Sequence, residues 1–183
     1  MKSVGFLLIF VISSSAFLEG VDISHVELFE SHGVIYRDEH GRAKDLYQLM
    51  KENTLSLIRL RLFTANEEQA QKDSDNNGHT LNLTLKLTRR VKAHELKFKP
   101  DFHYSDAWTY PEHQTKSSAW SNLAFGQLES ILSNYTRDSL HVFIEKETIP
   151  QYIQIGNEIT NGMLWPDGKL KKNSCWIQFT TVL

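Results

Sequence analysis

The chain has almost no cysteine and almost no excess charge. Its 183 residues include one Cys, and its formal net charge is −2. Cys175 has no partner for an internal disulfide, so stability must come from burying apolar side chains, and 40% of the residues are hydrophobic. A nearly neutral chain does not attract nucleic acid or anionic membranes, so neither is expected as a partner.

Several motifs of well-known chemistries are also missing. The chain has no G-x-G-x-x-G, no phosphate-binding P-loop and no G-x-S-x-G. The stretch HELKF (94–98) begins like a zinc-protease motif, but Phe98 stands where the second histidine is needed. His94 is therefore interpreted as a solvated residue of a basic helix. The eight histidines lack paired spacing, so no metal and no cofactor is expected.

Long apolar runs are absent beyond the first residues. Lys2 precedes an apolar stretch over 4–12, and the small residues Ser14 and Ala16 follow it. This layout predicts a secretory signal peptide over 1–16, because a membrane-spanning helix needs about 20 apolar residues. The chain is therefore expected to be secreted and extracellular. Two glycosylation sequons, at Asn82 and Asn134, fit that route.

Strand-like and helix-like patterns alternate along the rest of the chain, without repeats or a linker. Period-two apolar patterns predict strands at 21–24, 55–63, 96–106 and 151–158, and apolar spacing of three to four residues predicts helices at 42–53, 81–96 and 119–147. The order β-α-β-α-β-α-β predicts an α/β fold with a parallel sheet and right-handed crossovers. The polar segment 64–79 is interpreted as a solvated loop.

Polar side chains gather where the predicted strands end. They are Asp22 and Ser24, Arg59 and Arg61, Asp101, His103 and Asp106, and Asn157 and Glu158. The carboxyl ends of parallel strands form one face, so these groups are expected to converge there. Carboxylate, arginine, histidine and asparagine beside aromatic rings suit sugar chemistry, which needs a proton donor of raised pKa.

Three tryptophans lie close to the same loops. Trp108, Trp120 and Trp165 could each cover the apolar face of a pyranose ring or pack in the core. For Trp120, which falls on a predicted helix, core packing is the preferred interpretation.

Four segments together resemble a known family. DFHYSDAW (101–108), PEHQTKSSAW (111–120), NYT (134–136) and QIGNEITNGMLWPDG (154–168) closely resemble the arabinogalactan endo-β-1,4-galactanases of glycoside hydrolase family 53. The similarity extends in colinear order over about residues 20–170. It implies a (β/α)8 TIM barrel, of which this chain covers about the first four β/α units, a retaining two-carboxylate mechanism and β-1,4-galactan as the polysaccharide substrate.

The resemblance also implies roles for single residues. Glu158 corresponds to the general acid/base, and Asn157 to the residue that holds the 2-hydroxyl of the sugar. His103 and Arg59 or Arg61 would position groups near the cleaved bond, and Trp108 would line the cleft. Asp106 and Trp165 complete the expected substrate-binding set.

The chain departs from the family pattern in two ways. The family usually has Trp where Phe63 stands and Asp-Pro where Tyr110-Pro111 stands, so a contact with substrate or a neighbouring loop is expected to differ. The family nucleophile is a second Glu at the end of strand seven, and this chain stops soon after strand four. We therefore expect a truncated half barrel over 17–172, a divergent tail over 173–183, little or no activity, and self-association through two open sheet edges.

The sequence alone leaves two other functions open. The first is a catalytically dead galactan-binding or regulatory remnant that uses the same cleft. The second is another retaining glycosidase of the same clan, such as a cellulase or mannanase, which would share Asn157-Glu158 but not HYSDAW or GMLWP.

Overall fold

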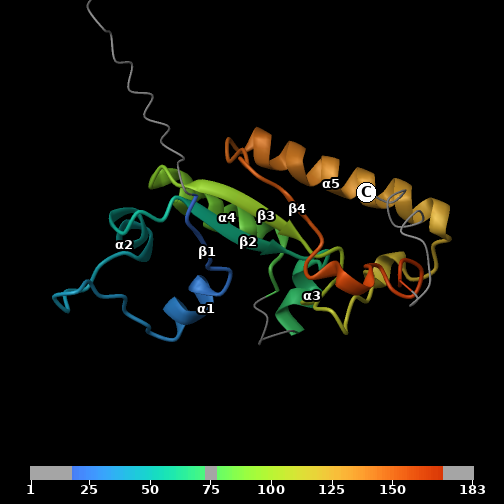
Figure 1. Cartoon of the computed structure of the whole chain (residues 1–183), viewed down its shortest axis with the longest axis horizontal. Helices are drawn as coiled ribbons and strands as arrows, with labels where there is room; N and C mark the ends of the chain where they lie inside the picture. The colour runs from blue at the N-terminus through green and yellow to red at the C-terminus, as the bar shows by residue number, and fades with distance from the viewer. Residues whose placement is uncertain (1–17, 73–77, 171–183) are drawn as a thin grey trace, which may run out of the picture.

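The fold is built on one parallel sheet, as the order of the predicted elements indicated. The computed structural model describes residues 18–72 and 78–170. Its strands are β1 (Gly20–Asp22), β2 (Leu57–Leu62), β3 (Lys97–Phe102) and β4 (Gln154–Ile155), in the spatial order β1-β2-β3-β4, with every pair parallel (Figure 1). The crossovers carry α2 (Leu46–Glu52), α4 (Leu81–Ala93) and α5 (Phe125–Glu145). The predicted α/β fold is confirmed.

The two faces of the sheet differ sharply in character. Residues that pair across the strands share a face, and successive residues alternate between faces. One face carries Ile58, Leu60, Leu62, Phe98 and Phe102, all nearly inaccessible to solvent. The opposite face carries the polar residues Asp22, Arg59, Arg61, Asp101 and Gln154. The sequence thus separates a hydrophobic core from a polar face on which a site can form.

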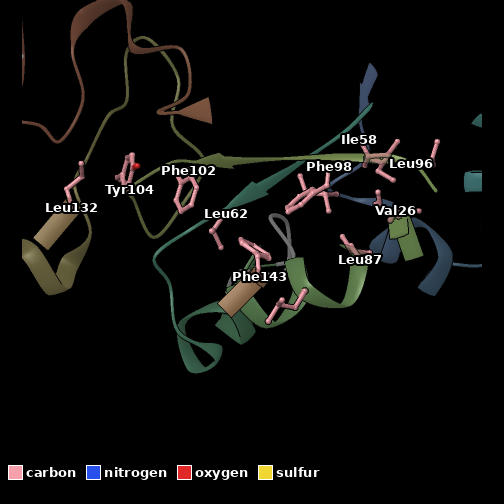
Figure 2. Close-up of a cluster of buried hydrophobic side chains, with 14 of the residues drawn as sticks. Val26, Ile58, Leu62, Leu87, Leu96, Phe98, Phe102, Tyr104, Leu132 and Phe143 are labelled. Carbon is pink, nitrogen blue, oxygen red and sulfur yellow. The ribbon is translucent and has the colours of Figure 1, made fainter. Parts of the chain in front are cut away.

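The hydrophobic core lies between the sheet and the long helices. Figure 2 shows Leu62 and Phe98 of the strands pointing toward Phe143 of α5 and Leu87 of α4. The rings of Phe98 and Phe143 meet edge to face with centroids 5.2 Å apart. Burial of these large apolar side chains stabilises the fold without disulfides.

Helix ends fall inside the predicted ranges because capping groups define them. α2 begins after Asp45, whose side chain accepts hydrogen bonds from the N–H groups of Tyr47 (2.9 Å) and Gln48 (3.1 Å). α4 ends at Ala93, since Glu95 takes a left-handed backbone conformation with φ of 58°. The segment before α5 forms a separate 3-10 turn at Ser118–Trp120.

Two short helices were not predicted, α1 (Val26–Ser31) and α3 (Glu67–Lys72). The interpretation of 64–79 as a solvated loop is wrong where α3 forms. Asn66 and Gln69 cap the start of α3 reciprocally, each backbone N–H donating to the other's side-chain oxygen at 2.9 Å. His79, at the end of the same segment, is only 1% exposed.

Strand β4 is much shorter than the predicted run 151–158. Gln151 explains part of the difference, because its side-chain oxygen accepts the Phe98 N–H at 2.8 Å and so replaces a ladder bond. Within the described residues, β1 and β4 each have one neighbouring strand. The predicted signal peptide and the predicted tail lie outside the described residues. Among those that are described, no helix has the length and apolar character needed to cross a membrane.

The burial of His79 makes stability depend on pH. Its ring meets Phe63 and His25 edge to face, at centroid distances of 5.0 and 4.9 Å. Burial, and then the neighbouring His25 and Arg61, lower the pKa of His79 from 6.5 to about 3. Because the folded-state pKa is depressed, the unfolded chain binds a proton first. Stability is therefore complete above pH 6.5 and falls as the pH drops toward 3.

We expect the free energy of unfolding to fall by about 1 kcal/mol per pH unit below pH 6 through His79 alone. Urea denaturation at pH 7.5 and at pH 5 measures this slope, and His79→Leu should flatten it. The matched control is His40→Leu, because the side chain of His40 is 65% exposed. Identical slopes for the wild type and His79→Leu would contradict the assignment.

Candidate active site

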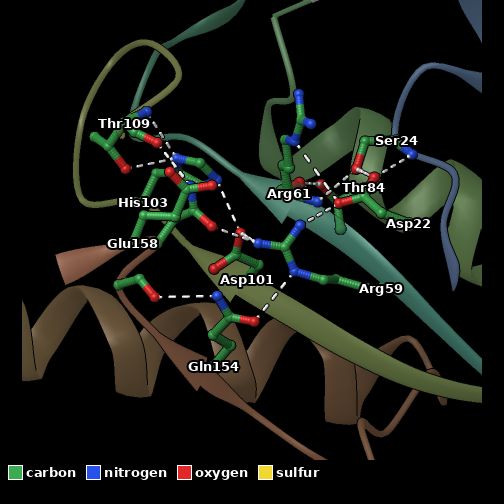
Figure 3. Close-up of polar contacts among 12 residues, drawn as sticks. Asp22, Ser24, Arg59, Arg61, Thr84, Asp101, His103, Thr109, Gln154 and Glu158 are labelled. Carbon is green, nitrogen blue, oxygen red and sulfur yellow. Dashed lines mark hydrogen bonds and ion pairs between the residues drawn. The ribbon is translucent and has the colours of Figure 1, made fainter. Parts of the chain in front are cut away.

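One guanidinium group joins residues of all four strands. Arg59 projects from the polar face of β2 and forms ion pairs with Asp22 of β1 and Asp101 of β3. It also donates to Gln154 Oε1 of β4 at 3.1 Å and to Asn157 Oδ1, just beyond β4, at 2.7 Å (Figure 3). The predicted convergence of strand-end residues therefore occurs around Arg59.

The carboxylates that face Arg59 are strongly engaged. Burial alone would raise the pKa of Asp22, but two hydrogen bonds from Ser24 and the charges of Arg59 and Arg61 hold it below its usual range. Asp101 is fully buried. Both groups are ion-pair partners of the arginines, and the second oxygen of Asp101, Oδ1, is buried without a hydrogen-bond partner among the described residues.

His103 continues this network in a defined tautomer. Its ring is inaccessible to solvent, and its Nδ1 lies 3.0 Å from the backbone N of Thr109. A backbone N–H can only donate, so Nδ1 is the acceptor and the ring hydrogen sits on Nε2. Nε2 lies 2.9 Å from Asp101 Oδ2, although the angle is outside the range of a hydrogen bond. His103 therefore links the loop after β3 to the strand-end cluster.

Asn157 and Glu158 follow β4 at the same end of the sheet. Asn157 is 4% exposed, and its Nδ2 donates to the carbonyl oxygen of Thr109 at 2.7 Å, which leaves one N–H for another acceptor. Glu158 is exposed and adopts a left-handed backbone conformation with φ 51° and ψ 43°. Such a conformation is unfavourable for a residue with a side chain and is found at functional sites.

A buried glutamine holds this strained turn. Gln114 is 1% exposed, and its Nε2 donates to the carbonyl oxygens of Asn157 (2.7 Å), Tyr110 (3.1 Å) and, more weakly, Glu158 (3.3 Å). The backbone carbonyl oxygen of Gln114 accepts a hydrogen bond from the backbone N–H of Trp165 at 2.7 Å. The loop after β3 and the loop after β4 are thereby fixed to each other around Glu158.

A second link between these loops is an ion pair. Lys116 Nζ lies 2.8 Å from Asp167 Oδ2, and Lys116 is only 9% exposed. The Asp167 carboxylate, which shares a loop with Glu158, is therefore committed to Lys116.

Arg61 and Trp108, two of the predicted substrate-binding residues, contact each other. The guanidinium carbon of Arg61 lies 4.9 Å from the centroid of the Trp108 ring, which is a cation–π distance. Trp108 is 43% exposed, so one face of the ring remains open to solvent or a ligand.

Asp106 and Trp165 are placed differently from the Arg59 cluster. Asp106 accepts hydrogen bonds from the hydroxyls of Thr64 (2.7 Å), Ser117 (2.7 Å) and Ser118 (2.6 Å), so it organises loops. Burial would raise the pKa of Asp106, but these bonds hold it below its usual range. Trp165 donates through Nε1 to the carbonyl oxygen of Asn161 at 3.2 Å and has Lys169 Nζ 3.7 Å from its ring centroid.

Trp120 packs in the core, as its position indicated. It is 6% exposed, and its ring lies 5.7 Å from that of Tyr135.

Three residues of the site were not predicted from the sequence: Thr109, Gln114 and Gln154. Gln154 alternates correctly with the apolar residues of β4, so its polar-face position was readable. Thr109 and Gln114 gave no signal of their own, because their roles depend on contacts between loops. Among the described residues, no group of three or more His, Cys, Asp or Glu side chains could hold a metal ion.

Comparison with known proteins identifies relatives of this chain. The family model described as Glycosyl hydrolase family 53 matches residues 18–183. An "Uncharacterized protein in bgaB 5'region" of Niallia circulans is 40% identical over 161 residues, covering 87% of this chain and 41% of the relative. The "Arabinogalactan endo-beta-1,4-galactanase" of Humicola insolens is 37% identical over 155 residues, covering 82% of this chain and 43% of the relative.

Solved structures give the same result. The Ignisphaera aggregans GH53 catalytic domain superposes with a TM-score of 0.78 and 35% identity, over 91% of this chain and 45% of that structure. A structure from a study of two fungal β-1,4-galactanases superposes with a TM-score of 0.79 and 32% identity, over 90% of this chain and 46% of that structure. The chain thus spans less than half the length of the proteins that it matches.

Proposed function

Because this chain belongs to glycosyl hydrolase family 53, we propose that it acts in the hydrolysis of β-1,4-galactan, with Glu158 as the general acid/base of a retaining reaction. Its relatives include proteins named as arabinogalactan endo-β-1,4-galactanases. The four described strands correspond to one part of the TIM barrel of the solved relatives.

The observation that carries the proposal is the exposed carboxylate of Glu158 on an otherwise immobilised turn. The neighbouring Asn157 is buried and bonded to Arg59 and Thr109, and Gln114 fixes the backbone on both sides. A proton donor must reach the glycosidic oxygen without moving far, so a rigid backbone under an accessible side chain suits that role.

The chemistry requires two carboxylates with different tasks. Glu158 would give its proton to the leaving oxygen while a second carboxylate bonds to the anomeric carbon. Glu158 would then take a proton from water as the water oxygen attacks that carbon and releases the second carboxylate. In the described ranges, the carboxylates nearest to the strand ends are engaged by Arg59, Lys116 or serine hydroxyls. We therefore propose that the nucleophile comes from polypeptide outside the described residues.

A complementation experiment tests the function. The chain is mixed with the part of the Humicola insolens galactanase that lies beyond the matched region, and reducing-sugar release from β-1,4-galactan is measured. We expect the chain alone to bind galactan without cleaving it and the mixture to release sugar. Failure of the wild-type chain to bind galactan in any form would overturn the proposal.

A second function, galactan binding without catalysis, is favoured by the same shortage of free carboxylates. In that case the mixture should bind galactan tightly and still release no sugar, although sedimentation shows that the two polypeptides have combined.

Secretion is part of the proposal and rests on the leader-like pattern over 1–16 and on the two sequons. The side chains of Asn82 and Asn134 are both exposed. The chain is expressed in a eukaryotic host, and the protein in the medium is sequenced from its N-terminus; we expect it to begin at Phe17. A protein that stays inside the cell with residues 1–16 still attached would argue against secretion.

We also propose that the edge of β4, which has no second neighbouring strand among the described residues, leads to self-association. The residues before β4 include the exposed side chains of Ile149, Tyr152 and Ile153, and an apolar pocket of about 420 Å³ lies between α5 and β4. An unpaired strand edge beside apolar surface pairs readily with another chain.

Sedimentation velocity is expected to show dimers of the chain, and Ile153→Lys should shift the protein toward monomer because an edge lysine opposes pairing. Ile35→Lys is the matched control, since Ile35 is 61% exposed and lies between α1 and α2. A wild-type chain that is monomeric at all concentrations would contradict the proposal.

A further inference from the structure

We propose that Trp108, Tyr110 and His113 form an aromatic subsite that binds one galactose ring of the polysaccharide next to the cleaved bond. This inference rests on the proposed function and deepens it, because it assigns a sugar-binding role to two residues, Tyr110 and His113, that the site described above does not use.

The first support is the alternation of side chains around Thr109. Thr109 is 1% exposed and points inward, where its N–H donates to His103 and its carbonyl accepts from Asn157. Its two neighbours are turned outward, with Trp108 43% and Tyr110 40% exposed. Both aromatic rings are therefore held one residue away from an anchor that also holds the neighbour of Glu158.

The second support is the rigidity of the turn that presents the rings. Tyr110 and His113 exchange two backbone hydrogen bonds, of 3.0 and 2.8 Å, and their rings stack with centroids 5.5 Å apart and planes at 20°. The Trp108 ring lies 6.0 Å from that of Tyr110. Gln114 bonds to the Tyr110 carbonyl as well as to that of Asn157. A ligand would therefore bind without first ordering this surface.

The third support is the match between this surface and galactose. The axial 4-hydroxyl of galactose leaves the carbon atoms on one face of the ring free to lie on an aromatic plane, while the hydroxyls point outward from the edges. Arg61, which lies over one face of the Trp108 ring, and the His113 imidazole, which stacks on the Tyr110 ring, supply polar groups beside the aromatic surface. Exposed aromatic rings with polar groups at their edges are typical of ligand-binding surfaces.

The ring of Tyr110 is the part of this surface that a single substitution removes most cleanly, because an aspartate in its place offers no ring on which a sugar can stack. The subsite should therefore favour longer galactan segments in the wild type more than in Tyr110→Asp.

The test measures binding of β-1,4-galactotetraose and galactobiose to the full chain by isothermal titration calorimetry. We expect Tyr110→Asp to weaken tetraose binding about 5- to 10-fold, and Tyr110→Phe to retain wild-type affinity, because the ring rather than the hydroxyl makes the contact. Tyr152→Ala is the matched control, since Tyr152 is 43% exposed but lies before β4. Circular dichroism verifies that each variant is folded.

The outcomes separate this inference from the function on which it rests. Unchanged tetraose affinity in Tyr110→Asp, with normal binding by the wild type, would overturn the subsite and leave the function standing. Equal affinity for β-1,4-linked glucose oligosaccharides would overturn galactose as its ligand. No binding of galactotetraose by the wild type would overturn both the function and the subsite.

Discussion

Glu158→Gln is expected to lower the rate of galactan hydrolysis by the complemented protein about 10²- to 10⁴-fold, the usual contribution of a positioned acid/base. Glutamine keeps the shape of the side chain but can neither give nor take the proton. Glu158 is exposed and no hydrogen bond to its carboxylate is seen among the described residues, so stability should be unchanged. The measurement is reducing-sugar release from β-1,4-galactan over a range of pH.

The leaving group provides an internal control for this assignment. With an aryl galactoside whose phenol leaves without protonation, the first step should be much less sensitive to Glu158→Gln than cleavage of galactan. Glu112→Gln is the matched control, because Glu112 is an exposed carboxylate on the neighbouring loop. Loss of activity to the same extent in both variants would show that Glu158 has no special role.

Arg59→Leu is expected to lower the free energy of unfolding by about 3–5 kcal/mol, because it leaves buried carboxylates without their counter-charge. Asp101 is 0% exposed and Asp22 is 25% exposed, and both lose their ion pair with Arg59. Domains are stable by only about 5–15 kcal/mol, so this one change should remove much of the total. Urea denaturation with a spectroscopic probe measures the effect.

A double variant separates lost charge pairing from lost packing. Arg59→Leu combined with Asp101→Asn should recover part of the stability, since the buried negative charge is no longer present. Arg137→Leu serves as control, because the partners of Arg137, Asp138 and Asn134, are exposed and its own side chain is 56% exposed. If Arg59→Leu were as stable as Arg137→Leu, Arg59 would not be the hub of the site.

The sequence predicted the sheet well because its information is local. Alternation in 55–63 and 96–106 marks buried positions on one face, and that alternation also puts Arg59 and Arg61 together on the other face. The lengths of strands depend instead on neighbours. β4 is short partly because the side chain of Gln151 replaces a backbone bond of its ladder, which no periodicity reveals.

The candidate site was predictable in composition but not in connectivity. Residues at strand ends were expected to converge, and Asp22, Asp101 and Asn157 do so around Arg59. Asp106 also follows a strand, yet it turns toward Thr64 and two serines because their hydroxyls satisfy its charge locally. The hydrogen-bond partner of a polar group depends on the conformation of the loops around it, and that conformation cannot be read from the linear sequence.

The residues of the loop after β3 differ in how freely they can be substituted. Two of them face inward: Thr109 holds the side chain of Asn157, and Gln114 holds the backbone of Asn157 and Glu158. Tyr110 and Glu112, in contrast, are exposed. Under the proposed function, substitutions at the outward positions would alter which sugars are preferred while Glu158 keeps its place. Substrate preference would then change among descendants of this chain without a matching loss of hydrolysis rate, as long as Thr109 and Gln114 are retained.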